Sequence, residues 1–131
     1  MATINPQLCD QFGVYVEVEQ GGEGPVPHVH VYWDKSRSPR KCSYVRLDKA
    51  EYSDHHKQPS KPLPRQVKKV FLDVMSKDWG RPSILENGTS VTLTGYQRAV
   101  DVWVDTYEHG SYDKFKLDEN GLPVMPNYNK L

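Results

Sequence analysis

The sequence predicts an α+β fold in which two helices pack on one face of an antiparallel three-stranded meander. The first third of the 131-residue chain alternates apolar and polar residues with a period of two, which is typical of half-buried strands. Two later segments, within residues 63–79 and 94–107, place apolar residues at helical spacing. Helices that cover one face of an antiparallel sheet form a two-layer domain.

The three strands are predicted within residues 12–19, 27–34 and 40–48, and connections rich in Gly, Ser and Pro separate them. One face of this sheet is mostly aliphatic, and we expect it to pack on the helices: Val14, Val16, Val18, Val29, Val31, Trp33, Ser43, Val45 and Leu47. The opposite face is polar and aromatic, and we expect it to be uncovered: Tyr15, Glu17, Glu19, His28, His30, Tyr32, Cys42, Tyr44 and Arg46.

The first helix is predicted in LPRQVKKVFLDVMSKDWG, where Pro64 suits the first turn and Gly80 suits the position after the last. The second helix follows Thr94–Gln97, which has the Thr-x-x-Gln form of a capping box. Residues 90–94 are a candidate for a further short strand that extends the architecture.

Length and composition predict one domain over residues 1–131. Residues 49–62 read as an exposed connection, and residues 111–131 as an irregular C-terminal tail with a turn at 119–121. No apolar run is long enough to span a membrane, the N-terminus lacks the pattern of a secretory signal, and the two cysteines form no framework. We therefore expect a cytoplasmic protein with reduced thiols and no membrane partner.

The zero net charge hides a pattern along the chain. Residues 1–34 carry five acids and no Lys or Arg (0 − 5 = −5), residues 35–77 carry twelve bases and four acids (12 − 4 = +8), and residues 78–131 carry five bases and eight acids (5 − 8 = −3). The basic middle is either a solvated loop and helix face or a site for a polyanion or acidic partner. Its candidate residues are Lys35, Arg37, Arg40, Lys41, Arg65, Lys68 and Lys69.

The Pro-His-Val-His-Val segment stands at the centre of the predicted meander. Aligning the aliphatic faces of the strands sets the register. Glu17 then lies opposite His30, and Glu19 opposite His28. On the other side, Tyr44 lies beside His30 and Arg46 beside His28, while Tyr32 lies opposite Cys42. Opposed β-carbons lie about 4.5–5.5 Å apart, which is close enough for a carboxylate to hold an imidazole proton.

Three interpretations of this face compete. In the first, cross-strand pairs only stabilise a solvated surface. In the second, its rings, imidazoles and arginine bind a protein or stack nucleic-acid bases. In the third, the face is a metal or catalytic site, for which His28, His30 and Cys42 are the candidate ligands. His-x-His is weakly specific by itself, and the usual nucleotide and metalloprotease motifs do not occur in the sequence. We expect no cofactor.

The strand ending in Val-Glu-Val-Glu, the Pro27–Val31 segment and the helix opening on Leu63-Pro64 resemble the small bacterial proteins of the Domain of Unknown Function 4160 family. The resemblance covers roughly residues 12–77, with Val26-Pro27 where the family has Pro-Pro and with a longer link before the helix. It implies a small prokaryotic cytoplasmic protein, often encoded in operons of toxin–antitoxin character. It implies no reaction, and it singles out His28 and His30.

The leading functional prediction is a small recognition domain, from a toxin–antitoxin or mobile-element system, that binds a protein, RNA or DNA partner. Its binding residues are predicted to be Glu17, Glu19, His28, His30, Tyr32, Tyr44 and Arg46. The alternative is a small toxin-type nuclease or metal-assisted hydrolase, in which His30 acts as the base and Arg46 stabilises phosphate charge.

Overall fold

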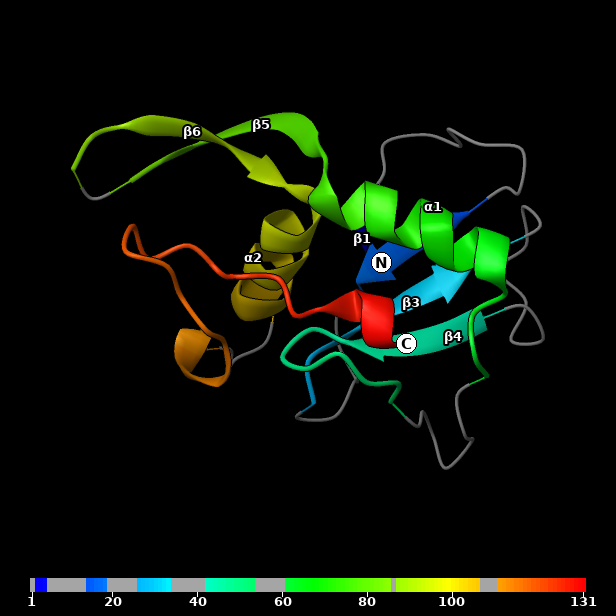
Figure 1. Cartoon of the computed structure of the whole chain (residues 1–131). Coiled ribbons are helices and arrows are strands. Elements are labelled where there is room, and N and C mark those ends of the chain that lie inside the picture. The colour runs from blue at the N-terminus through cyan, green and yellow to red at the C-terminus, as the bar shows by residue number, and fades with distance from the viewer. Residues whose placement is uncertain are drawn as a thin grey trace.

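The computed structural model describes residues 2–4, 14–18, 26–33, 42–53, 61–85, 87–106 and 111–131. It shows the predicted α+β architecture, with an antiparallel sheet, two helices on one of its faces and a separate two-stranded hairpin (Figure 1). In the part of the chain that is described, no helix is long and apolar enough to cross a membrane.

The main sheet has four antiparallel strands in the order β1-β2-β3-β4. They are β1 (Ala2–Thr3), β2 (Tyr15–Val18), β3 (His28–Tyr32) and β4 (Cys42–Arg46). The predicted meander is confirmed as β2, β3 and β4, and β1 extends it at the outer edge of β2. The predicted register is confirmed as well, because Glu17 pairs with His30, His30 with Tyr44 and His28 with Arg46.

Helices α1 (Arg65–Ser76) and α2 (Gly95–Thr106) pack on the aliphatic face of this sheet (Figure 1). The apolar stripe of α1 buries Val67, Phe71, Val74 and Met75 against the valines of the strands. Burial of apolar area stabilises the fold by roughly 25 cal/mol per Å² removed from water. The predicted capping box begins α2: the backbone N–H of Gln97 donates to Thr94 Oγ1, and that of Thr94 donates to Gln97 Oε1.

The end of α1 differs from the prediction. The helix stops at Ser76, and Gly80 lies inside strand β5 (Asp78–Ile84) rather than at a helix terminus. Pairing with β6 (Ser90–Thr94) draws the chain into an extended conformation from residue 78 onward. Pro64 is the residue before the helix rather than part of its first turn. Helix boundaries are the least certain part of a pattern-based prediction, because tertiary pairing overrides local preference.

The tail packs against the helices through two aromatic residues. Tyr128, in the short 3-10 helix η3 (Tyr128–Lys130), lies edge-on to Phe71 and Tyr96 and donates its hydroxyl to the Arg46 carbonyl at 2.7 Å. Phe115 follows η2 (Tyr112–Lys114) and packs against Trp103 of α2. Both rings belong to the core cluster that contains the sheet valines. The tail therefore completes the helix layer.

Candidate functional site

One face of the sheet carries the side chains to which the sequence assigned a function. We call it the histidine face, and it consists of Glu17, His28, His30, Tyr32, Cys42 and Tyr44. The prediction that this face is uncovered is wrong, because these side chains range from 1% exposed for Glu17 to 8% for Tyr44. Alternation shows which side chains share a face, but it does not show whether that face is covered. Three further predicted members remain: Arg46 is partly exposed, and the side chain of Tyr15 and the whole of Glu19 lie outside the described residues.

The rings of the histidine face pack as one cluster. The rings of His28 and His30 stack with centroids 5.3 Å apart and an interplanar angle of 15°. Tyr44 meets both imidazoles edge-on, with its centroid 5.0 Å from His30 and 6.3 Å from His28. Edge-on and stacked ring pairs contribute about 0.5–1.5 kcal/mol beyond the area they bury. This arrangement is typical of an aromatic interior and stabilises the sheet from its second face.

Hydrogen bonds orient both imidazoles. His28 Nδ1 lies 2.9 Å from the Val26 carbonyl oxygen, which can only accept, so Nδ1 carries a proton. His30 Nδ1 lies 3.1 Å from the Tyr32 hydroxyl. Nε2 is therefore the nitrogen that each ring would offer to a ligand. A general base must lie within hydrogen-bond reach of its substrate, and at 7% and 4% exposure His28 and His30 do not offer that access to a polymer.

Cys42 does not complete a metal site with the two histidines. It pairs with Tyr32, at the opposite end of β3 from His28. Among the residues that the structure describes, no group of three or more His, Cys, Asp or Glu side chains is placed to hold a metal ion. Burial raises the pKa of the Cys42 thiol to about 11, although hydrogen bonds with Tyr44 and Tyr32 act in the opposite direction. A thiol with this pKa is almost fully protonated near neutral pH, which makes it a weak nucleophile.

Arg46 is already paired within the chain. Its Nε donates to Asp48 Oδ1 at 2.9 Å and a terminal nitrogen donates to Oδ2 at 2.7 Å, while the Glu51 carboxylate lies 3.9 Å away. The hydrogen bond with Asp48 is the main reason that the pKa of Arg46 rises further above its ordinary value. A bidentate pair of this kind fixes the guanidinium. A phosphate would have to displace Asp48 before Arg46 could stabilise its charge.

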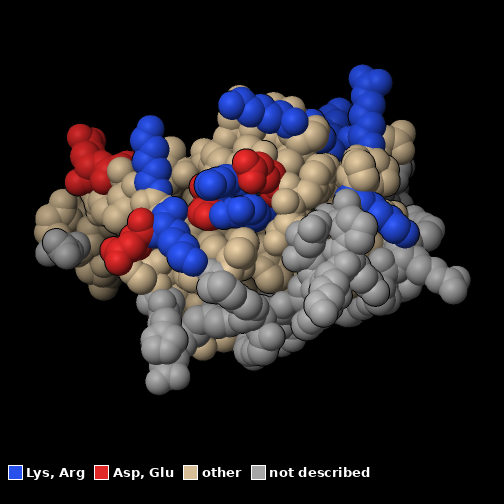
Figure 2. All heavy atoms as spheres, turned by 90° about the horizontal axis from the view of Figure 1, so that it is seen from below, with Lys and Arg blue, Asp and Glu red and all other residues tan. Residues whose placement is uncertain are grey.

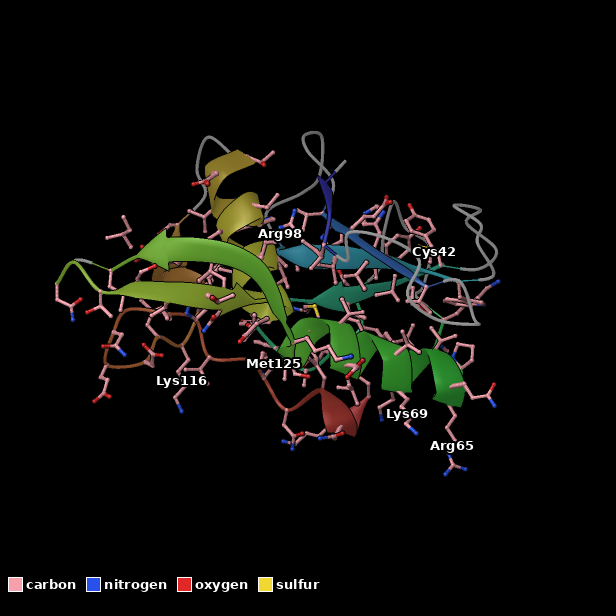
Figure 3. All side chains as sticks on the ribbon, turned by 90° about the horizontal axis from the view of Figure 1, so that it is seen from above. Cys42, Arg65, Lys69, Arg98, Lys116 and Met125 are labelled. Carbon is pink, nitrogen blue, oxygen red and sulfur yellow. The ribbon has the colours of Figure 1, made fainter. Side chains whose placement is uncertain are left out.

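Three of the seven residues of the predicted basic patch lie in the described chain, and all three are on α1: Arg65, Lys68 and Lys69. Arg65 and Lys69 are exposed one turn apart on α1 and point away from the sheet (Figure 3). Lys68 instead donates to the backbone carbonyls of Asn129 at 2.9 Å and Leu131 at 2.6 Å, which ties α1 to the tail. On the face drawn in Figure 2, acidic and basic groups lie next to one another. The other four candidates lie outside the described residues: Lys35, Arg37, Arg40 and Lys41.

A different part of the surface has the form of a binding site. An open cleft of about 580 Å³ lies between the end of the β5–β6 hairpin and the turn of the tail. We call it the hairpin cleft; Ile84, Leu85 and Asn87 line one side, residues 117–123 the other, and Asp101 of α2 and Tyr112 the remainder. Figure 1 shows the hairpin extending from the body above the tail segment that faces it.

The two sides of the hairpin cleft are built by tight turns. Asn87 and Gly88 close β5 onto β6, with Gly88 at φ 84°, a backbone conformation that favours glycine. In the tail, the backbone N–H groups of Asn120 and Leu122 donate to Asp118 Oδ1, and a bridge between residues 117 and 123 completes a small hairpin. The Gln97 side chain donates to the Pro123 carbonyl and holds this hairpin on α2.

The cleft combines exposed apolar side chains with carboxylates. Ile84 is 77% exposed and Leu117 41%, and Val124 next to the cleft is 39% exposed; these are the large apolar residues that remain exposed in the described part of the chain. Asp101, Asp118 and Glu119 also line the cleft, and its described lining contains no Lys or Arg. Asp101 accepts a hydrogen bond from the Tyr112 hydroxyl, and burial together with this carboxylate raises the pKa of Tyr112.

Sequence reasoning missed the cleft because neither of its sides shows a regular period. Gly80 and Pro82 interrupt the segment that becomes β5 and weigh against a strand. The usable signal was the Asn87-Gly88 pair in front of the alternating residues 90–94, which is typical of a hairpin turn. The turn at 119–121 was predicted and is confirmed, with Gly121 at φ 78°.

Comparison of the chain with protein-family models, with curated proteins and with solved structures gave no match. The resemblance of residues 12–77 to the Domain of Unknown Function 4160 family therefore stays an expectation, and the functional argument depends on the geometry of the chain itself.

Proposed function

We propose that this protein is a small recognition domain that binds a segment of a partner protein in the hairpin cleft. The observation that carries the proposal is the concentration of exposed apolar surface there. Ile84 and Leu117, the two most exposed large apolar side chains of the described chain, line the cleft, whereas Val124 lies outside its lining. Exposed apolar side chains that lie among polar groups are typical of protein interaction sites.

The predicted class of function, a recognition domain, is kept, but the proposed binding site is the hairpin cleft and not the histidine face. The histidine face supplies little surface to a partner, since its side chains are at most 8% exposed. A nuclease reaction at His30 and Arg46 gains no support from the geometry, because His30 is 4% exposed and Asp48 holds the guanidinium. A nucleic-acid partner is disfavoured at the cleft by Asp101, Asp118 and Glu119, which would repel phosphates.

The test is a selection of peptides from a random displayed library of about twelve residues, followed by affinity measurements on the purified chain. We expect the selected peptides to lose at least ~10-fold in affinity for an Ile84→Ser/Leu117→Ser variant, because exposed anchors at the centre of an interface carry most of its binding energy. Both side chains are largely outside the core, so the variant should fold as the wild type does.

The matched control is Val124→Ser, which also removes a partly exposed apolar side chain but lies outside the cleft lining. It should stay within about threefold of the wild-type affinity. Equal affinities of the wild type and the double variant for the selected peptides would rule out the cleft as the binding site.

A further inference from the structure

The outer edge of β5 is open towards the hairpin cleft. Within the described chain β5 pairs with β6 alone. Ile84 and Leu85 at the end of β5 line the cleft, whereas no residue of β6 does. The cleft therefore lies on the side of β5 that faces away from β6. An open strand edge is a template for pairing with another extended chain.

The register identifies the backbone groups at this edge. The Leu85 N–H donates to the Thr89 carbonyl at 2.8 Å, which makes these two residues a hydrogen-bonded pair. In an antiparallel ladder such pairs alternate with pairs whose N–H and C=O groups point away from the neighbouring strand. Ile84 and Pro82 occupy these alternate positions. The N–H and C=O of Ile84 and the C=O of Pro82 are thus available to a further strand, and proline is tolerated there because its missing N–H faces outward.

The negative charges that line the cleft favour a partner strand with positively charged side chains. Asp101 comes from α2, and Asp118 and Glu119 come from the tail turn, so carboxylates stand on two sides of the same space. Glu119 is exposed, Asp101 accepts a hydrogen bond from the Tyr112 hydroxyl, and the described lining contains no Lys or Arg. A partner segment that carries Lys or Arg complements this potential, and one that carries Asp or Glu is repelled.

We propose that the occupant of the hairpin cleft is an extended segment of a partner protein in which basic and apolar side chains alternate, added to β5 as a third strand. This inference rests on the function proposed above and specifies the chemistry and the mode of binding. In an added strand, alternate side chains point to opposite sides. The apolar set contacts Ile84 and Leu117, and the basic set faces the carboxylates.

The probe is a capped synthetic peptide of about eight residues in which valine and lysine alternate, and the matched control replaces every lysine with glutamate. Binding is measured by fluorescence anisotropy on the full chain at low salt. We expect the lysine peptide to bind at least ~10-fold more tightly than the glutamate peptide, and this difference to shrink as salt screens the carboxylates. Glu119→Gln should weaken the lysine peptide by about two- to fivefold.

Two further peptides test strand addition. One is N-methylated at its valines and the other at its lysines, so that only one of them blocks the N–H groups that face β5. If one methylated peptide loses its affinity for the chain and the other keeps it, the result supports addition of a third strand. If both keep or both lose their affinity, strand addition is overturned.

The failure of this inference is distinguishable from the failure of the proposed function. If the Ile84→Ser/Leu117→Ser variant binds the lysine peptide as the wild type does, the cleft is not the site and both proposals fall. If that variant loses binding but the glutamate peptide binds the wild type equally well, only the basic-strand inference falls. A wild-type dimer that the double variant converts to a monomer would assign the cleft to a second copy of the chain and would also overturn it.

Discussion

The histidine face and the hairpin cleft differ in opposite ways: one has reactive residue types that are buried, and the other has ordinary residue types that are accessible. The first gathers imidazoles, phenols, a thiol and a carboxylate, the residue types from which catalytic sites are built, but it is buried and internally bonded. The second contains ordinary aliphatic and acidic residues, yet it is open and its aliphatic side chains are exposed. The comparison shows that reactive residue types identify a functional site only when the fold leaves them within reach of a ligand.

The largest expected effect is the loss of stability on His30→Ala. The substitution removes a buried ring that stacks on His28 and meets Tyr44 edge-on, and it leaves polar neighbours without their packing. We expect a decrease of about 2–4 kcal/mol in the free energy of unfolding, measured by urea denaturation. A decrease below about 0.5 kcal/mol, as for a surface site, would mean that the histidine face is exposed.

The His30→Ala variant also tests whether the histidine face contributes to binding at the hairpin cleft. Under conditions where it stays folded, His30→Ala should bind the selected peptides within about threefold of the wild-type affinity, because the ring lies outside the cleft lining. Abolished binding by the folded variant would return the function to the histidine face.

The next effect is the pH dependence that Cys42 contributes. The pKa of its thiol is raised from 9.0 in the unfolded chain to about 11 in the folded one by burial. The folded state therefore holds the proton more tightly, and the resulting stabilisation is present below pH 9 and is lost as the pH rises through 11.

Comparison with Cys42→Ala isolates this contribution, because the pKa values of Tyr96 and Tyr128 are also raised and act in both proteins. Under reducing conditions, the stability of the wild type relative to the variant should fall by about 2 kcal/mol between pH 8 and pH 11. A constant difference across this range would show that the thiol is not buried in the folded state.

A smaller effect is expected for Tyr128→Phe. The hydroxyl donates to the Arg46 carbonyl at 2.7 Å and links the tail to the last residue of β4. Its removal leaves a carbonyl without this donor, and we expect the free energy of unfolding to fall by about 1 kcal/mol. Tyr52→Phe is a comparison variant elsewhere in the fold: its hydroxyl accepts from the backbone N–H of Leu63, and its loss should cost a similar amount. A zero effect at Tyr128 would contradict the docking of the tail.

The smallest effect on stability is expected where the effect on binding is largest. Ile84→Ser/Leu117→Ser removes side chains that are 77% and 41% exposed, so the free energy of unfolding should change by less than about 0.5 kcal/mol. Differential scanning fluorimetry checks this. A large destabilisation would show that these side chains belong to the core.

The sequence was sufficient for the elements that depend on local period. Alternation in residues 12–48 predicted the meander and its register, because a shift of one residue would have placed Val29 and Val31 on the polar face. Thr94 and Gln97 predicted the start of α2 through their reciprocal bonds. These features are set by side chains close together in the chain or in neighbouring strands.

Accessibility could not be predicted in this way. The burial of His30 depends on the packing of other segments, which a two-residue period does not encode. The hairpin cleft joins Ile84 to Leu117, which lie 33 residues apart (117 − 84) and share no pattern. Pro82 hid strand β5, because the tolerance of proline at a strand edge is visible only once the register is known.

The most direct test of the central claim is a nuclear magnetic resonance titration of the isotopically labelled chain with a selected peptide. We expect the amide signals that shift to belong to Ile84, Leu85 and residues 117–122, and those of β3 and β4 to stay in place. Shifts concentrated in His28–Tyr32 and Cys42–Arg46, with the cleft unchanged, would contradict it and would make the histidine face the functional surface.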